Sequence, residues 1–187
     1  SVRLVDGTVL RLRPSSQLQL RESKRLPDAA LTKSGARLQR GRVEIDAAPV
    51  QGGKPGFRID TPQGLLGVRG TSFRVASDGE QAATRGEVIA GTVGFSGTAP
   101  GAAVVPVPQG FGSVIGSGGV VAPPVKLLEA PDVAALPNLQ ERLLVRFTVP
   151  SVPGAVAYRV QVAPAAAPDA VQADLLSATT ELRIDGL

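Results

Sequence analysis

The chain has 187 residues, 43% hydrophobic, 19% charged and 3% aromatic, with a net charge of +4 and no His, Cys, Met or Trp. The absent residue types exclude His-activated nucleophiles, ordinary zinc, haem-thiolate and iron–sulfur sites, and disulfides. We therefore expect a protein that is not an enzyme, needs no cofactor, and has no catalytic, cofactor-binding or metal-binding residues.

The first 21 residues predict short strands joined by tight turns. Asp6 and Gly7 stand between two apolar runs, which is a strong hairpin signal, and residues 9–13 alternate apolar and polar side chains. Pro14 ends this run, and residues 18–21 alternate again. With 22 Gly and 16 Pro in the chain, short strands fit this composition better than helices.

The same pattern continues to residue 95. Residues 62–64 (PQG) and 78–79 (DG) are turn signals between strand-like runs, and one short helix is predicted at 27–31. Regularly spaced short strands predict an all-β fold, a β-sandwich or jelly roll. The further strand-like segments are 38–45, 57–61, 65–75 and 87–95.

Residues 88–125 contain no charged side chain. A span of about 20 apolar residues would suffice to cross a membrane as a helix. This stretch instead holds nine Gly and five Pro, and the proline at 106 is followed by another at 108. Because proline disrupts a regular helix, buried strands joined by glycine-rich turns are the better interpretation.

Charge is distributed unevenly along the chain. Residues 1–121 carry 15 Lys and Arg against 9 Asp and Glu, whereas residues 122–187 carry 5 against 7. The basic half suggests an acidic partner. Its arginines alternate with apolar residues, as on the solvent face of strands, and aromatic side chains for stacking on bases are scarce, so no nucleic-acid partner is expected.

The order of these segments resembles the FecR domain. The resemblance covers residues 1 to about 120, and its most specific element is 68–75 (VRGTSFRV). Residues 107–112 (VPQGFG) resemble the closing strand of that family. The other matching segments, in order, are 4–12 (LVDGTVLRL) with Ser15 and Ser16, Leu38 with 41–43 (GRV), 57–62 (FRIDTP) and 87–93 (EVIAGTV).

This resemblance implies a periplasmic all-β sensory or interaction domain. In the namesake regulators the domain lies on the periplasmic side of an inner-membrane protein, receives a signal from an outer-membrane iron-siderophore transporter and passes it to a cytoplasmic sigma factor. Here the domain is followed by a further module, so the chain is more similar to secreted relatives in which it follows a peptidoglycan-binding LysM module. The chain does not begin with Met, so we expect any signal peptide, LysM module or membrane anchor upstream of Ser1.

A second module is expected after a proline-rich linker at 122–126. Residues 127–187 contain runs that resemble the early strands of a fibronectin type III or Ig-like sandwich, and Phe147 stands where that family usually places a core Trp. About 100 residues are usual for an Ig-type sandwich, so this module is expected to be incomplete. The predicted domains are thus 1–121, FecR-like, and 127–187, partial fibronectin type III-like. The matching runs are 127–131 (LLEAP), 143–149 (LLVRFTV) and 155–162 (AVAYRVQV).

Two pairs of carboxylates keep a glycan hydrolase open as an alternative. Glycosidases need only two Asp or Glu, and spacing of two places both on one face of a strand. We favour simple structural roles for both pairs, in a strand end and a turn. Neither residues 51–55 (QGGKP) nor 110–116 (GFGSVIG) fits a phosphate-binding or dinucleotide-binding glycine pattern. The two pairs are Glu44 with Asp46 and Asp78 with Glu80.

Arg69 is the one candidate binding residue that the sequence offers. Its guanidinium could hold a carboxylate or phosphate with two parallel hydrogen bonds. The neighbouring Gly70 and Thr71 favour a structural role for the motif, because glycine in a strand often marks a bulge or a close backbone approach.

The hypothesis that fits these features is a non-enzymatic, periplasmic or otherwise extracytoplasmic interaction module. It would bind an envelope protein or peptidoglycan, and an exposed strand edge would be a natural docking mode. Membrane contact is expected only through an upstream segment. The alternative is the signal-receiving periplasmic domain of a FecR-type anti-sigma regulator of iron-siderophore uptake.

Overall fold

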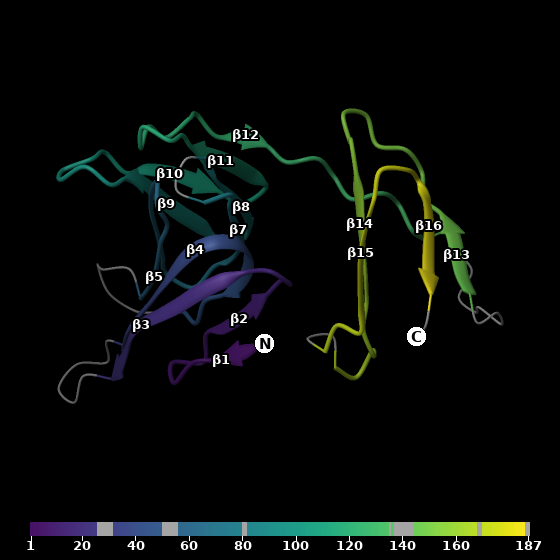
Figure 1. Cartoon of the computed structure of the whole chain (residues 1–187), viewed down its shortest axis with the longest axis horizontal. Coiled ribbons are helices and arrows are strands. Elements are labelled where there is room, and N and C mark those ends of the chain that lie inside the picture. Colours follow the sequence, from purple (N-terminus) through teal and green to yellow (C-terminus); the bar gives the residue numbers. More distant parts are fainter. Residues whose placement is uncertain are drawn as a thin grey trace. The chain divides into compact units, whose positions relative to one another are not determined.

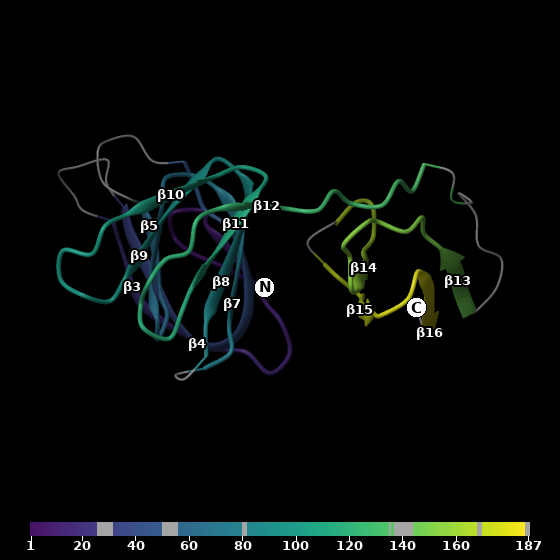
Figure 2. The same ribbon diagram turned by 90° about the horizontal axis from the view of Figure 1, so that it is seen from above.

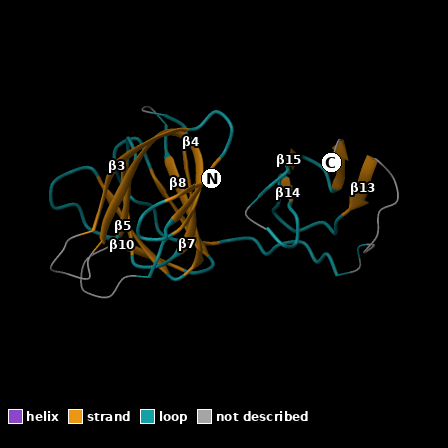
Figure 3. Cartoon of the chain, turned by 90° about the horizontal axis from the view of Figure 1, so that it is seen from below, coloured by secondary structure: helices purple, strands orange, loops and turns teal. Residues whose placement is uncertain are grey.

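The computed structural model describes residues 1–25, 32–49, 56–79, 82–134, 136, 144–167 and 170–185. Within these ranges the protein consists of strands and loops and is all-β, as predicted (Figure 3). The short helix predicted at 27–31 lies outside the described residues. The chain divides into two compact units, Ser1–Leu127 and Leu128–Leu187.

Twelve strands of unit 1 are described, and hydrogen bonds link them into one continuous, folded sheet. β4 is its longest strand and appears in Figure 1 as a strongly curved ribbon. The strands are β1 (Val2–Arg3), β2 (Val9–Leu12), β3 (Gln17–Arg25), β4 (Thr32–Asp46), β5 (Phe57–Asp60), β6 (Gly64–Val68), β7 (Ser72–Ser77), β8 (Thr84–Ala90), β9 (Thr92–Gly97), β10 (Val105–Pro108), β11 (Phe111–Ile115) and β12 (Val125–Lys126).

The sheet folds into two layers that share β4 (Figure 2). The first half of β4 pairs with β3 on one side and with β5 on the other. From β5 the sheet continues through β6 and β9 to β10, and we call this set of strands the β3 layer. The second half of β4 pairs with β2 and β7, and this β2 layer extends to β1 on one side and through β8 and β11 to β12 on the other. The result is a β-sandwich-like fold.

β4 changes partners at Gly41, because β3 pairs with it up to Arg40 and β7 pairs with it from Gly41 onward. This residue has φ +95°, and a Cβ built there would lie 2.4 Å from Ser16 Oγ and 2.5 Å from Ser16 Cα. Ser16 Oγ accepts a hydrogen bond from Arg42 N and donates one to Arg42 O, both at 3.0 Å. The side chain of Ser16 therefore supplies hydrogen-bond partners to the backbone of Arg42, at the point where the partner of β4 changes from β2 to β3.

A single hydrophobic core fills the space between the layers. Alternate residues of β5, β6 and β7 are buried, as the period-two pattern predicts. Gly86 of β8 leaves room for Phe95 of β9, whose Cζ would lie 2.3 Å from a Cβ at that position. Each large side chain buried in this way contributes about 1.5–3 kcal/mol. The largest core side chains include Leu10, Leu38, Ile45, Phe57, Ile59, Leu66, Phe73, Phe95 and Ile115.

The outer face of the β2 layer carries a ladder of ion pairs across β2, β4, β7 and β8. Glu44 lies opposite Arg11 on one side and Arg74 on the other, and its Oε1 is 3.7 Å from the Arg13 guanidinium. Glu44 and Asp46 are thus both engaged by arginines, which agrees with the structural role favoured for them. The pairs of this ion-pair ladder are Arg11–Asp46, Arg13–Glu44, Arg74–Glu44 and Arg74–Glu87.

Asp46 makes the stability of this layer depend on pH. Burial raises the pKa of Asp46, but hydrogen bonds from Ser72 and Arg11, with the charge of Arg11, lower it by more, so the pKa lies below its usual value. A lowered pKa contributes stability above the unfolded value of about 3.9, and this contribution is lost as pH falls through the folded pKa. Asp46→Asn should cost less than about 1 kcal/mol at pH 7, because the pair is partly exposed to solvent, and should weaken the acid dependence in urea unfolding. An unchanged pH profile would contradict this role.

Unit 2 holds two small antiparallel sheets within the described residues. β13 (Leu144–Thr148) pairs with β16 (Glu181–Asp185), and β14 (Tyr158–Val162) pairs with β15 (Ala173–Ser177). Val149, Leu182 and Ile184 are its buried hydrophobic side chains. Two of the runs assigned to the second module, 143–149 and 155–162, coincide with β13 and β14, whereas no strand is formed at 127–131. A fibronectin type III-like identity for this unit stays a prediction.

Two boundaries differ from the sequence-based expectation. The expected linker 122–126 contains β12, which pairs with β11 and belongs to unit 1, so the units divide at Leu127 and Leu128. The expected closing strand at 107–112 is the end of β10, a turn and the start of β11. The second difference arises because Gly110, at φ +78°, turns the chain between β10 and β11.

Candidate binding groove

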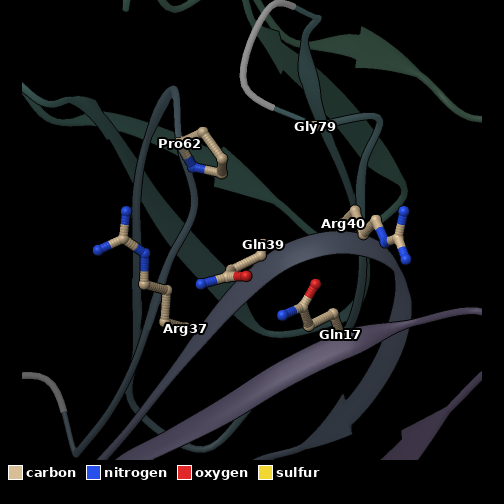
Figure 4. Close-up of a pocket in the computed structure, with 6 residues that line it drawn as sticks. All are labelled: Gln17, Arg37, Gln39, Arg40, Pro62 and Gly79. Carbon is tan, nitrogen blue, oxygen red and sulfur yellow. The ribbon is translucent and has the colours of Figure 1, made fainter.

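A groove of about 250 Å³ lies at the end of the β3 layer, between the curved β4 and the turns that follow β5 and β7 (Figure 4). Figure 4 shows Gln17 and Gln39 between the two arginines, with Pro62 and Gly79 across the opening. The residues that line this groove are Gln17, Arg37, Gln39, Arg40, Pro62 and Gly79. We call it the Arg37–Arg40 groove.

The Arg37–Arg40 groove is lined by basic and amide side chains and by no carboxylate. Arg40 is exposed and Arg37 is half-buried. The Nε of Arg37 is buried and has no hydrogen-bond partner. A buried donor without an acceptor costs free energy, so the groove favours a ligand that brings an acceptor, such as a carboxylate or phosphate oxygen.

A second groove of about 400 Å³ adjoins the first and shares Arg37 and Pro62 with it. It contains an ion pair along β5, in which Arg58 Nε lies 2.7 Å from Asp60 Oδ1. The hydrogen bond from Arg58 to Asp60 raises the pKa of Arg58 above its usual value. Because this arginine is paired with a carboxylate, the second groove offers less net positive charge than the first.

A buried network of polar side chains holds the rims of the Arg37–Arg40 groove together. Gln63 Nε2 donates a hydrogen bond of 2.7 Å to the Gly79 carbonyl, which ties the turn after β5 to the turn after β7. The Thr84 hydroxyl lies 2.8 Å from both Gln63 Oε1 and Thr61 Oγ1. Gln63 and Thr84 are 2% and 0% exposed, so solvent cannot replace these bonds.

The structure assigns a backbone role to Gly70 in the Arg-Gly-Thr motif. Gly70 has φ +79°, and a Cβ there would lie 2.6 Å from Pro49 Cα, so this turn between β6 and β7 requires glycine. Arg69 is exposed beside it and lines neither groove. A ligand-binding role for Arg69 stays a prediction.

The remaining carboxylate candidates show no catalytic arrangement in the part of the chain that is described. Asp78 pairs with Arg85, and Glu80 lies outside the described residues. The described residues contain no group of three or more His, Cys, Asp or Glu that could hold a metal ion. Among them there is also no helix long and apolar enough to cross a membrane.

The sequence did not single out Arg37 and Arg40 because the groove is formed by distant segments. Gln17 lies opposite Arg40 across the β3–β4 ladder, whereas Pro62 and Gly79 come from later turns. The available local signal was the alternation of Arg37 and Gln39 with buried Ala36 and Leu38. This pattern predicts an outward-facing arginine but not its neighbours.

Comparison with known families finds a match over the first half of the chain. A family profile described as FecR protein matches residues 1–94, which is half of the chain. No curated protein matches the chain.

Solved structures with a similar fold come from Parabacteroides distasonis ATCC 8503. Two crystal structures of a candidate anti-sigma factor, at 2.50 and 1.65 Å resolution, match with a TM-score of 0.51 and 19% and 21% identity. Each match covers 67% of this chain and 54% of the other, so the chain spans about half the length of that protein. At this identity the likeness concerns the fold alone.

Proposed function

The chain belongs to the FecR protein family, and from this premise we propose that it is the signal-receiving, non-enzymatic interaction domain of a FecR-type regulator. The observation that carries the proposal is the family match over residues 1–94. The fold shared with a candidate anti-sigma factor supports the same class of function. In this role the domain would lie outside the cytoplasm, bind a protein that reports a bound siderophore, and pass the signal towards a sigma factor.

The structure of unit 1 suits a binding role. Its core is formed by apolar side chains, and the hydrogen-bonded network of Gln63, Thr61 and Thr84 joins the two turns at the rim of the Arg37–Arg40 groove. A preformed site loses little conformational entropy on binding. The two grooves and the strand edges, rather than a catalytic centre, are therefore the surfaces that a partner would use.

Titration calorimetry tests this proposal directly. The chain should bind the purified signalling domain of an outer-membrane siderophore transporter from the same organism. The transporter plug without its signalling domain is the control and should give no heat. Absence of binding to the signalling domain would contradict the regulatory function.

A second candidate function is attachment to anionic groups of the cell wall. The observation that favours it is the Arg37–Arg40 groove, which combines two guanidinium groups, no carboxylate and the unpartnered Nε of Arg37. Carboxylates of peptidoglycan stem peptides are ligands of the required charge. In this role the protein would be an envelope-binding module, as the similarity to LysM-associated relatives suggested.

Co-sedimentation with purified sacculi tests this second function. The double variant Arg37→Gln, Arg40→Gln should reduce retention at least about tenfold, since a hydrogen bond to a charged group contributes about 1.5–3 kcal/mol. Arg42→Gln is the matched control, because Arg42 is also exposed on β4 but lies in the half that pairs with β2 and β7. Equal loss in both variants, or no retention of the native chain, would eliminate this candidate.

A further inference from the structure

The four edges of the folded sheet in unit 1 differ in how open they are to another strand. β1 and β12 have two residues each, too few to form a hydrogen-bonded ladder with an added strand. β10 is longer but has the sequence Val-Pro-Val-Pro. β3 has nine residues, no proline, and no described strand on the side away from β4.

The prolines of β10 close that edge. Alternate residues of a strand direct their N–H groups to opposite sides, and proline has no N–H group. Because hydrogen bonds to β9 need N–H donors, the backbone polar groups of Val105 and Val107 point towards β9. The backbone of Pro106 and Pro108 then faces outward. The outer side of β10 therefore offers no donors, and β3 is the long edge that can accept a strand in the described part of unit 1.

The core-facing side of β3 is incompletely covered. Leu20 lies opposite Ala36, which is 1% exposed, yet Leu20 itself is 47% exposed. The difference arises because Ala36 lies on β4 between β3 and β5, whereas no described strand lies beyond β3 to cover Leu20. An apolar side chain on an added strand would cover Leu20.

The charge of the β3 edge selects an acidic partner. Residues 17–25 and 32–40, which form the β3–β4 ribbon, contain six Lys and Arg and one Glu, whereas the whole chain has 20 against 16. On the outer face of the β2 layer the arginines are balanced by the ion-pair ladder. Along the β3–β4 ribbon, the side chains that the structure describes, those of residues 17–21 and 34–40, form no ion pair. A second copy of β3 would bring like charges together and is disfavoured.

We propose that β3 binds an extended segment of a partner protein in which acidic and apolar residues alternate, by adding it as a further strand to the β3 layer. The apolar residues would cover Leu20 on the core side, and the acidic residues would lie on the outer face, where Arg37 contributes positive charge from beyond β3. This rests on the proposed interaction function and specifies its docking surface. Main-chain hydrogen bonds supply affinity in this mode, and the alternating side chains supply specificity.

The probe for this docking mode is a nine-residue peptide that alternates glutamate with valine. It should protect amide hydrogens of residues 17–25 from exchange and leave those of β10 unchanged. Two further peptides carry N-methyl groups at odd or at even positions. Because only alternate N–H groups of an added strand face β3, one methylated peptide should lose binding and the other should keep it. Equal loss, or equal retention, would overturn strand addition.

Two substitutions on β3 test its side chains. Leu20→Ala and Arg21→Glu should each weaken peptide binding about fivefold, while the matched changes Val5→Ala and Arg3→Glu, at exposed sites of the β2 layer, should not. No peptide binding, protection centred on the Arg37–Arg40 groove, or equally tight binding of an oligonucleotide would refute the β3 site. If Arg21→Glu leaves binding of the transporter signalling domain intact, the β3 inference fails while the proposed function stands.

Discussion

Gly41→Ala is expected to destabilise unit 1 by roughly 2–5 kcal/mol, a large part of the 5–15 kcal/mol typical of a folded domain. Two effects combine at this position. The φ of +95° is costly for any residue with a Cβ, and that Cβ would lie 2.5 Å from Ser16 Cα, a backbone atom that cannot rotate away. Relief would require β2 and β3 to move away from β4, which would break the Ser16–Arg42 hydrogen bonds.

A series of glycine substitutions separates the two effects. Gly118→Ala has open space around it and should change the free energy of unfolding by less than about 0.5 kcal/mol. Gly79→Ala meets no atom within 4 Å but has φ +104°, so it should cost only the backbone term of about 1–2 kcal/mol. In urea unfolding of the three variants, Gly41→Ala should lose much more free energy of unfolding than Gly79→Ala. Equal costs at both positions would show that the close approach to Ser16 is unimportant.

The strands and their faces were predictable because the signal is local. The alternation at 57–61 and 87–95 corresponds to β5 and to β8 with β9, and most buried residues of these strands are apolar, with Thr84 and Ser96 as buried polar exceptions. The Asp6-Gly7 turn is also formed, with Gly7 at φ +89°. In contrast, residues 65–75 were predicted as one strand-like segment, whereas Gly70 divides them into β6 and β7.

The site was not predictable because it depends on register between distant segments. The predicted strand at 38–45 begins six residues later than β4, so Arg37 fell outside it. Both arginines come just before Gly41 on β4 and line one groove with the turns at Pro62 and Gly79, and no sequence spacing encodes that approach. The basic composition of residues 1–121 did indicate an acidic partner, but only the pairing of β3 with β4 indicates which edge is free to meet it.

Gln63→Glu is expected to reverse the pH dependence of stability. In the native network Gln63 Nε2 donates to the Gly79 carbonyl and Oε1 lies 2.8 Å from the Thr84 hydroxyl. A protonated glutamic acid can reproduce both bonds, because its O–H donates to Gly79 and its C=O accepts from Thr84. An ionised carboxylate cannot donate, and at a position that is 2% exposed its charge would be desolvated.

The sign of the effect follows from linkage between protonation and folding. Burial would raise the pKa of the introduced carboxyl by about 3 units above its unfolded value near 4.3, so the folded state would bind the proton more tightly. Stability would then be retained below about pH 4 and lost as pH rises towards 7, by roughly 4 kcal/mol in total. This is opposite to the effect of Asp46, whose lowered pKa makes the native protein lose stability as pH falls.

Unfolding in urea at pH 4 and at pH 7 measures this difference. Gln19→Glu is the matched control, because Gln19 is exposed on β3 and its replacement should change stability by less than about 0.5 kcal/mol at either pH. Binding can be followed on the same samples. The Gly79 and Pro62 rims are joined through Gln63, so ligands of the Arg37–Arg40 groove should be bound by the variant in acid and released near neutrality. A variant that is equally stable at both pH values would mean that water enters the network, and the groove would then be less rigid than its hydrogen bonds indicate.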